Sequence, residues 1–316
     1  MDNNSEIAKQ WADLMAQPYS VDNQNKISAL LNPEASEWHQ LSSEAQFESA
    51  TDLLSMISSK VVGRPMMLNH SYATAVLGKM CLTAMSAQAL FRDHEAGKLP
   101  TIDHSSIAIL CRTIIEASIM YWYLTEEMTE DEWAFRHQVM KVHDAAARVR
   151  FWKAPMPEEA DQSRIVLDKL RNELKAMPLF WKRSENDRTK MRGGQTVYVN
   201  GMRSVAKSMG VEETYFDGMY NYLSAQVHST PISYFRDSED DASQIIWSRG
   251  FSQYALHHAM TMMFRVALRE IELSKLEDEF DLELLNEVRE IVAGKPAPED
   301  QLPTPKEPPP DSSAGP

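Results

Sequence analysis

The chain has 316 residues, of which 43% are hydrophobic and 25% are charged, and its formal net charge is -14. This length and composition predict a folded protein with one large domain and a small appended one, or with two modest domains. The acidic balance argues against a dedicated nucleic-acid-binding protein, because phosphate contacts need a basic face, although a small basic pocket for RNA is compatible with it.

Neither the N-terminus nor the cysteines indicate export. The first residues, MDNNSEIAKQWADLM, lack the basic segment and apolar core of a secretory signal. No run approaches about 18 uncharged apolar residues, so we expect no membrane span. Cys81 and Cys111 lie in apolar stretches without a CxxC pair, which indicates two buried thiols. We therefore expect a cytoplasmic protein.

Long stretches without glycine or proline predict helices from the N-terminus onward. Two helices, at about 5–16 and 43–60, form a predicted N-terminal region, residues 1–62, packed on the main domain. Gly63-Arg64-Pro65 then breaks the chain, and the main domain covers residues 63–294. The expected helices of that domain are residues 71–96, 105–127, 130–152, 158–176, 200–209, 212–228, 240–274 and 281–293.

The predicted fold class is therefore all-α, a multi-helix and mainly antiparallel bundle. Strand-like alternation occurs only at residues 196–199, which follow Gly193-Gly194 in an expected loop. Residues 295–316 contain eight prolines, no aromatic residue and one leucine. Such a segment cannot bury enough apolar surface to offset its ordering entropy, so we expect a disordered proline-rich C-terminal tail.

Arg112 and Glu116 are the first polar pair on an otherwise apolar helix. They are four residues apart in CRTIIEA, so they share one helix face and can form an ion pair. A half-buried pair of this kind either joins helices or forms part of a binding site that a ligand completes.

Arg136 and His143 form the second candidate group. They are at i and i+7, with six residues between them, which places both on one helix face, two turns apart. An arginine that stabilises phosphate charge beside a histidine that acts as acid or base is a workable constellation for metal-free RNA cleavage.

Tyr220, Ser224 and His228 form the third group, near the end of the expected helix 212–228 and before Pro231. Each is four residues from the next, so they share one face. Ser224 and His228 either bond each other or a neighbouring carbonyl, or they line a polar pocket with Tyr220. A serine nucleophile is not indicated, because no GxSxG elbow is present.

No sequence motif indicates a metal or a cofactor. There is no Glu-x-x-His, His-x-x-x-His, Walker loop, GxGxxG or EF-hand loop. The adjacent pair His257-His258 points in directions about 100° apart on a helix, which does not chelate one metal. We therefore expect no metal and no cofactor.

Two of these stretches together resemble a known family. The pair Arg112 and Glu116, followed by Tyr220-x-x-Leu223-Ser224-x-x-Val227-His228, is similar to the bacterial helical family of unknown function DUF5677. The resemblance covers about residues 65–270 and implies an all-α bundle without an established activity. The ending Leu-Ser-x-x-Val-His also resembles a degenerate form of the HEPN nuclease signature, but Leu223 stands where the signature has arginine.

Two functions follow as hypotheses. The first is a non-catalytic binding or interaction module whose polar pocket, formed from Arg112, Glu116, Tyr220, Ser224 and His228, takes a partner protein or a small anionic ligand. The second is a HEPN-like, metal-independent ribonuclease, a toxin or antiphage effector, which would use Arg136 and His143 or a site around His228. RNA is a partner only under the second hypothesis, and both are compatible with a homo-oligomer.

Overall fold

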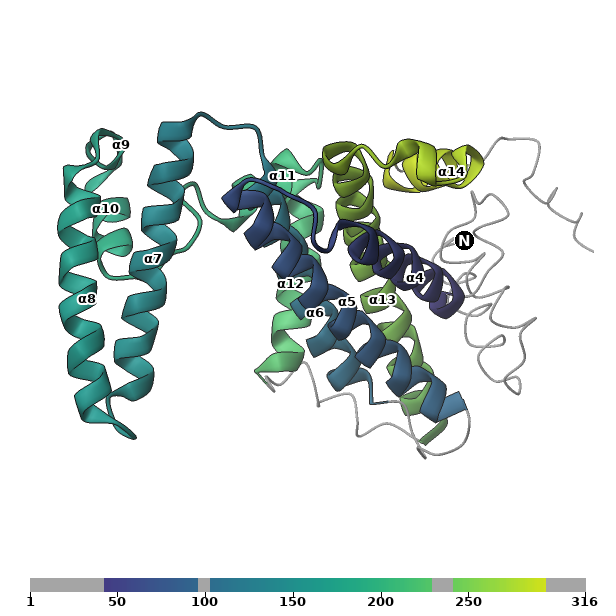
Figure 1. Cartoon of the computed structure of the whole chain (residues 1–316). Coiled ribbons are helices and arrows are strands. Elements are labelled where there is room, and N and C mark those ends of the chain that lie inside the picture. The colour runs from purple at the N-terminus through teal and green to yellow at the C-terminus, as the bar shows by residue number, and fades with distance from the viewer. Residues whose placement is uncertain (1–42, 96–102, 229–240, 294–316) are drawn as a thin grey trace, which may run out of the picture. The chain divides into compact units, whose positions relative to one another are not determined.

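The computed structural model describes residues 43–95, 103–228 and 241–293 (Figure 1). Within these ranges the chain forms helices and loops and no strand. The predicted all-α fold is thus confirmed. The expected helix at 5–16 and the tail at 295–316 lie outside the described residues.

The predicted helices in the described ranges begin and end within a few residues of their expected positions. They are α4 (Ser43–Val61), α5 (Leu68–Glu95), α6 (His104–Thr125), α7 (Glu130–Trp152), α8 (Pro157–Ala176), α11 (Met202–Ser208), α12 (Glu213–Val227), α13 (Asp241–Ser274) and α14 (Leu282–Ala293). Three short elements were not predicted: α9 (Pro178–Trp181), α10 (Glu185–Arg192) and the 3-10 turn η2 (Glu277–Glu279). Residues 196–199 form the expected loop.

Local capping explains where α7 starts. The Thr129 hydroxyl accepts a hydrogen bond from the backbone N–H of Glu132, and the Glu132 carboxylate accepts one from the backbone N–H of Thr129. This reciprocal capping box satisfies two donors that the first turn leaves unpaired. At the other end, the turn 153–156 leads to Pro157, which opens α8 at a position where the missing N–H costs nothing.

The chain divides into two compact units, each assembled from segments that are distant in sequence. Among the described residues, one contains 43–57, 84–95, 103–111, 225–228 and 241–293, and the other contains 58–83 and 112–224. The predicted domain boundaries at residues 62 and 294 stay a prediction.

The first unit has a core rich in methionine and phenylalanine. The buried side chains on α13 include Met260, Met262, Met263 and Phe264, each at most 2% exposed. The Arg265 guanidinium donates to the Val292 carbonyl at 3.0 Å, which ties α13 to α14. The methionine cluster therefore fills the core, which is the commoner use of this side chain.

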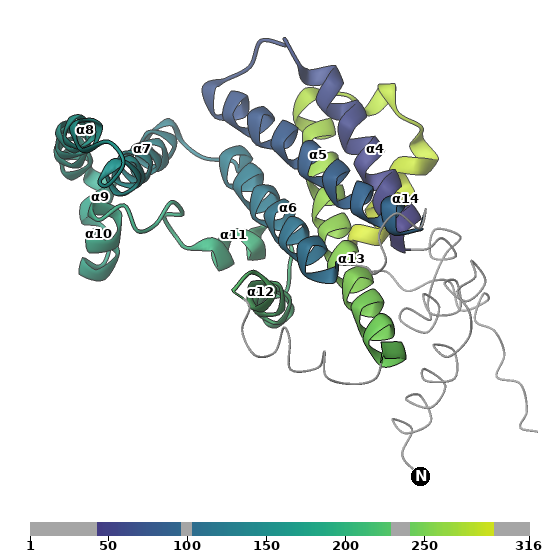
Figure 2. The ribbon, with the colours of Figure 1, turned by 90° about the horizontal axis from the view of Figure 1, so that it is seen from below.

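The second unit contains most of the candidate residues. Its α7 and α8 run side by side and antiparallel, with α9 and α10 completing this part of the unit (Figures 1 and 2). The Gln138 amide crosses between the two long helices and donates to the Leu170 carbonyl at 2.8 Å. A polar side chain that is 5% exposed thus has the partner that its burial requires.

Two helices are long and apolar enough to cross a membrane by length and composition alone. They are residues 68–93 of α5 and residues 104–125 of α6, with mean hydropathies of 1.2 and 1.4. Core helices of soluble proteins pass the same test, and 56% of the apolar window of α6 is buried inside the protein. The expected absence of a membrane span stays a prediction.

Candidate functional site

Arg112, Glu116 and Tyr220 meet in one hydrogen-bonded group, although more than a hundred residues separate Tyr220 from the first two. Arg112 donates through Nε to Glu116 Oε1 at 3.0 Å and through Nη2 to the Tyr220 hydroxyl at 2.9 Å. The Tyr220 hydroxyl in turn donates to Glu116 Oε1 at 2.8 Å. Each member contacts both others, so α6 and α12 hold the group, named here the Arg112 triad, from two sides.

Aromatic rings hold Tyr220 in place within the triad. The Arg112 guanidinium lies 4.9 Å from the centroid of the Tyr220 ring, close enough for a cation–π contact. Phe216, one turn earlier on α12, stacks on the same ring with centroids 5.5 Å apart, and is itself buried. The four-residue spacing of Phe216 and Tyr220 makes this stacking a local consequence of the helix.

The triad is buried on the arginine side and open on the carboxylate side. The Arg112 side chain is 17% exposed and that of Glu116 is 40% exposed. Burial raises the pKa of Tyr220, and its hydrogen bond to Glu116 raises that pKa further. Burial also raises the pKa of Tyr198, with a smaller contribution from the negative charge of Glu116. Both phenols are therefore neutral at physiological pH and act as hydrogen-bonding groups.

The guanidinium of Arg112 retains donors that the triad does not use. A guanidinium carries five N–H groups. The bonds to Glu116 and Tyr220 use two of them, which leaves three without a partner among the residues that the structure describes. An arginine held in place with unused donors fits a carboxylate or phosphate, because its planar fork matches the oxygens of either group.

Ser224 and His228 do not join the triad. The Ser224 hydroxyl donates to the Tyr220 carbonyl at 2.6 Å, one turn back along α12. It therefore bonds a neighbouring carbonyl, one of the arrangements expected from the sequence. His228 follows the last residue of α12 and is exposed. The structure thus brings together three of the five predicted binding residues.

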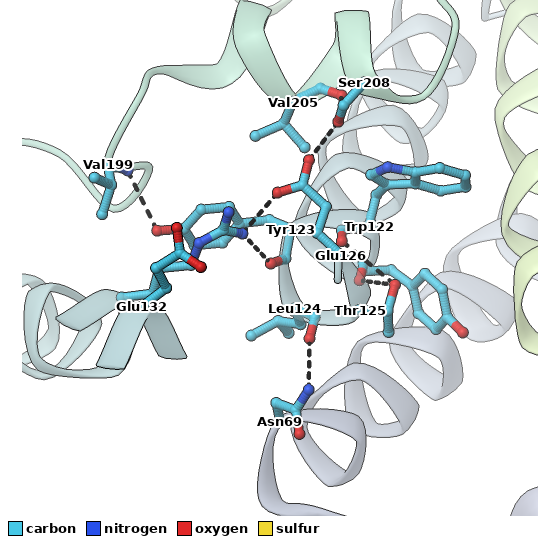
Figure 3. A network of polar contacts seen from close by, with 12 residues as sticks. Asn69, Trp122, Tyr123, Leu124, Thr125, Glu126, Glu132, Val199, Val205 and Ser208 are labelled. Atoms are coloured by element: carbon cyan, nitrogen blue, oxygen red, sulfur yellow. Dashed lines mark hydrogen bonds and ion pairs between the residues drawn. The ribbon is translucent and has the colours of Figure 1, made fainter. Parts of the chain in front are cut away.

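Arg136 belongs to a different group at the end of α6, and its partners Tyr123 and Glu126 are labelled in Figure 3. Its Nη1 lies 2.7 Å from Glu126 Oε2 and donates to the Tyr123 carbonyl, also at 2.7 Å. The Arg136 guanidinium also lies 4.4 Å from the centroid of the Tyr123 ring. Because the last carbonyls of a helix have no partner within it, Arg136 acts as a side-chain cap of α6.

Further bonds extend this group, named here the Arg136 cap, to other parts of the same unit. Figure 3 shows the Ser208 hydroxyl of α11 donating to Glu126, and the backbone N–H of Val199 donating to the Tyr123 hydroxyl at 3.3 Å. Burial raises the pKa of Tyr123 to about 12. The cap therefore connects α6, α7, α11 and the loop before α11.

His143 lies away from the Arg136 cap on the same helix. Seven residues at 1.5 Å rise place it about 10 Å further along α7. Its Nδ1 is buried without a hydrogen-bond partner among the described residues. Gly194, at φ +61°, packs against this part of α7, and a Cβ there would lie 2.3 Å from the Cβ of Ala146. The predicted nuclease pair thus shares a helix without sharing a site.

Sequence reasoning missed Glu126, Tyr123, Tyr198 and Phe216. The spacing of Phe216 and Tyr220 could have indicated the stacked pair. The other three become partners only through the tertiary fold, and nothing in their local sequence indicates this. Among the described residues, no group of three or more His, Cys, Asp or Glu side chains could hold a metal ion.

The comparison with protein families agrees with the resemblance seen in the sequence. A model described as a family of unknown function (DUF5677) matches residues 70–244, more than half of the chain. The chain belongs to this family. The DUF5677 match includes the Arg112 triad, the Arg136 cap and His228. No curated protein and no solved structure matches the chain. The likeness to HEPN nucleases stays a prediction.

Proposed function

We propose that this DUF5677 protein is a non-catalytic binding module that holds an anionic group, on a small ligand or a partner protein, at Arg112. The observation that carries the proposal is the guanidinium with three unused N–H donors, held by Glu116 and Tyr220. Glu116, at 40% side-chain exposure, keeps this group in contact with solvent. The proposal includes the cytoplasmic location, which two buried thiols suit.

The chemistry of the triad favours binding over turnover. Tyr220 has a raised pKa, so it is not a base near neutral pH, and the Ser224 hydroxyl is bonded to a backbone carbonyl. The Tyr220 hydroxyl does have a carboxylate within hydrogen-bond reach, Glu116 at 2.8 Å, but the same carboxylate oxygen also accepts from Arg112. The groups of the triad instead have the donors and aromatic surfaces that recognise a carboxylate or phosphate.

The ribonuclease alternative would rest on Arg136 and His143, or on His228. For Arg136 it would need a guanidinium that is free to meet phosphate. That guanidinium instead bonds Glu126 and the Tyr123 carbonyl, and its side chain is 15% exposed. The geometry therefore favours the binding module.

A calorimetric titration with inorganic phosphate, and another with acetate, tests the proposal on the full chain. Wild type should bind at least one of these probes. Arg112→Gln should weaken that binding at least about tenfold, because a hydrogen bond to a charged group is lost. Arg164→Gln is the matched control, since Arg164 also pairs with an acid on its own helix, Asp161, at 2.8 Å, but on the surface of α8. Equal binding by wild type and Arg112→Gln would contradict the proposal.

An RNA cleavage assay in EDTA tests the alternative. The binding module predicts that wild type leaves diverse RNAs intact. Cleavage that is lost in a folded Arg136→Ala, His143→Ala or His228→Ala variant would establish the nuclease instead and would locate its site.

A further inference from the structure

A pocket between α7 and α8 forms a second candidate site, separate from the Arg112 triad and within the same unit. It has a volume of about 310 Å³ and is lined by Lys141, Asp144, Ala145, Arg148, Gln162, Ser163, Val166 and Leu170. This volume lies at the lower end of the range of small-molecule pockets.

Both helices contribute apolar and polar groups to the pocket. Its apolar lining residues are Ala145 of α7 and Val166 and Leu170 of α8. Lys141 and Arg148 come from one face of α7, while Gln162 and Ser163 come from α8. A ligand here would therefore meet both apolar carbon and polar donors.

The charges in the pocket leave one cation uncompensated. Arg148 pairs with Asp144 through an Nε–Oδ2 contact of 2.9 Å, so these two charges balance each other. Lys141 has no ion-pair partner among the described residues, and its side chain is only partly exposed. The pocket thus carries one net positive charge in a chain whose formal net charge is -14.

We propose that this pocket binds a small amphiphilic monocarboxylate, with the carboxylate at Lys141 and the hydrocarbon part against Ala145, Val166 and Leu170. One ammonium balances one carboxylate, and the Gln162 amide and Ser163 hydroxyl supply further donors. The apolar surface adds affinity in proportion to the hydrocarbon area that it removes from water.

A calorimetric titration of the full chain with hexanoate, 1-hexanol and inorganic phosphate tests this proposal. Hexanoate should bind most tightly, since it alone has both the charge and the tail. Lys141→Met keeps the aliphatic stem and should weaken hexanoate binding at least about tenfold. The same titrations on Arg112→Gln remove any carboxylate or phosphate binding at the triad, so the hexanoate binding that is left in this variant reports on the pocket alone.

A second variant keeps the test decisive if Lys141→Met does not fold. Val166 is 52% exposed, so Val166→Glu should fold, and its carboxylate should repel hexanoate and abolish binding. The proposal is overturned if, in the Arg112→Gln background, 1-hexanol or phosphate binds as tightly as hexanoate. It is also overturned if hexanoate does not bind wild type, or if it binds the folded variants as tightly as wild type.

Discussion

The Arg112 triad and the Arg136 cap use the same three residue types in two different ways. Each combines an arginine, a glutamate and a tyrosine, and in each the guanidinium lies over the tyrosine ring. In the cap both charged side chains are covered, at 15% and 19% exposure. In the triad the arginine is covered at 17%, but the glutamate is open at 40%.

The difference lies in the partners. The guanidinium of the cap bonds a backbone carbonyl, and its glutamate accepts from Ser208 on another helix, so the group joins elements of the fold. The triad bonds only side chains, and its glutamate is open to solvent. Residue types alone do not separate a structural ion pair from a binding site, whereas backbone partners and the exposure of the carboxylate do.

Removing the two arginines should separate the groups most strongly. Arg136→Met leaves the Glu126 carboxylate half-buried and the Tyr123 carbonyl without its donor, and should lower the free energy of unfolding by about 3 kcal/mol. Arg112→Met leaves Glu116 in contact with solvent and should lower it by only about 1 kcal/mol. Urea unfolding followed by circular dichroism measures both. Equal losses in the free energy of unfolding for the two variants would contradict the proposed difference between the cap and the triad.

Gly194→Ala should lower stability through α7 near His143, away from both the triad and the Arg136 cap. The positive φ of +61° and the 2.3 Å approach to Ala146 leave no room for a Cβ, so the loop must move from α7. We expect a loss of about 2 kcal/mol in the free energy of unfolding. Gly78→Ala is the control, because a Cβ there meets nothing within 4 Å. A stable Gly194→Ala variant would show that this contact is not needed.

Tyr220→Phe should have a smaller effect on stability, confined to the triad. It keeps the ring on Phe216 but removes the hydroxyl that bonds Arg112 and Glu116, at a cost of about 1 kcal/mol in the free energy of unfolding. Thermal unfolding with phosphate present and absent measures the effect. A loss as large as that of Arg136→Met would mean that the triad is structural.

The last expected effect is a pH dependence of the cap, which is absent at neutral pH. The pKa of Tyr123 is about 12 in the folded chain against 10.0 for the free side chain. A raised pKa gives stability that is fully present below pH 10 and is lost as the pH rises toward 12. Urea unfolding at several pH values in this window should therefore show a shallower decline for Tyr123→Phe than for wild type. Identical declines in the free energy of unfolding for the two chains would show that Tyr123 does not cause this pH dependence.

The sequence could predict most of the helices because their signals are local. The capping pair Thr129 and Glu132 and the prolines that follow α7 determine that helix from its own residues. By contrast α10, with the sequence ENDRTKMR, has no apolar periodicity, and its start depends on the Ser184 cap. Its signals are the cap and the charges at its two ends, and without an apolar stripe these did not lead to a predicted helix.

The candidate site was predictable to a lesser degree. The four-residue spacing of Arg112 and Glu116 predicted their ion pair, which the structure contains. The interpretation of Arg136 and His143 as a pair could not anticipate Glu126, because a shared helix face does not reveal which distant residue covers it. Arg136 and His143 do lie on one helix, but the ion pair with Glu126 directs the Arg136 side chain toward the end of α6.

Arginine side-chain NMR during a phosphate titration tests the central difference most directly. The Nε–Hε resonances of Arg112 and Arg136 would be assigned with Arg112→Lys and Arg136→Lys variants and followed in one sample. We expect the Arg112 resonance to shift and saturate while that of Arg136 stays in place. A stationary Arg112 resonance, or a saturating shift of Arg136, would contradict the proposed difference between the triad and the cap.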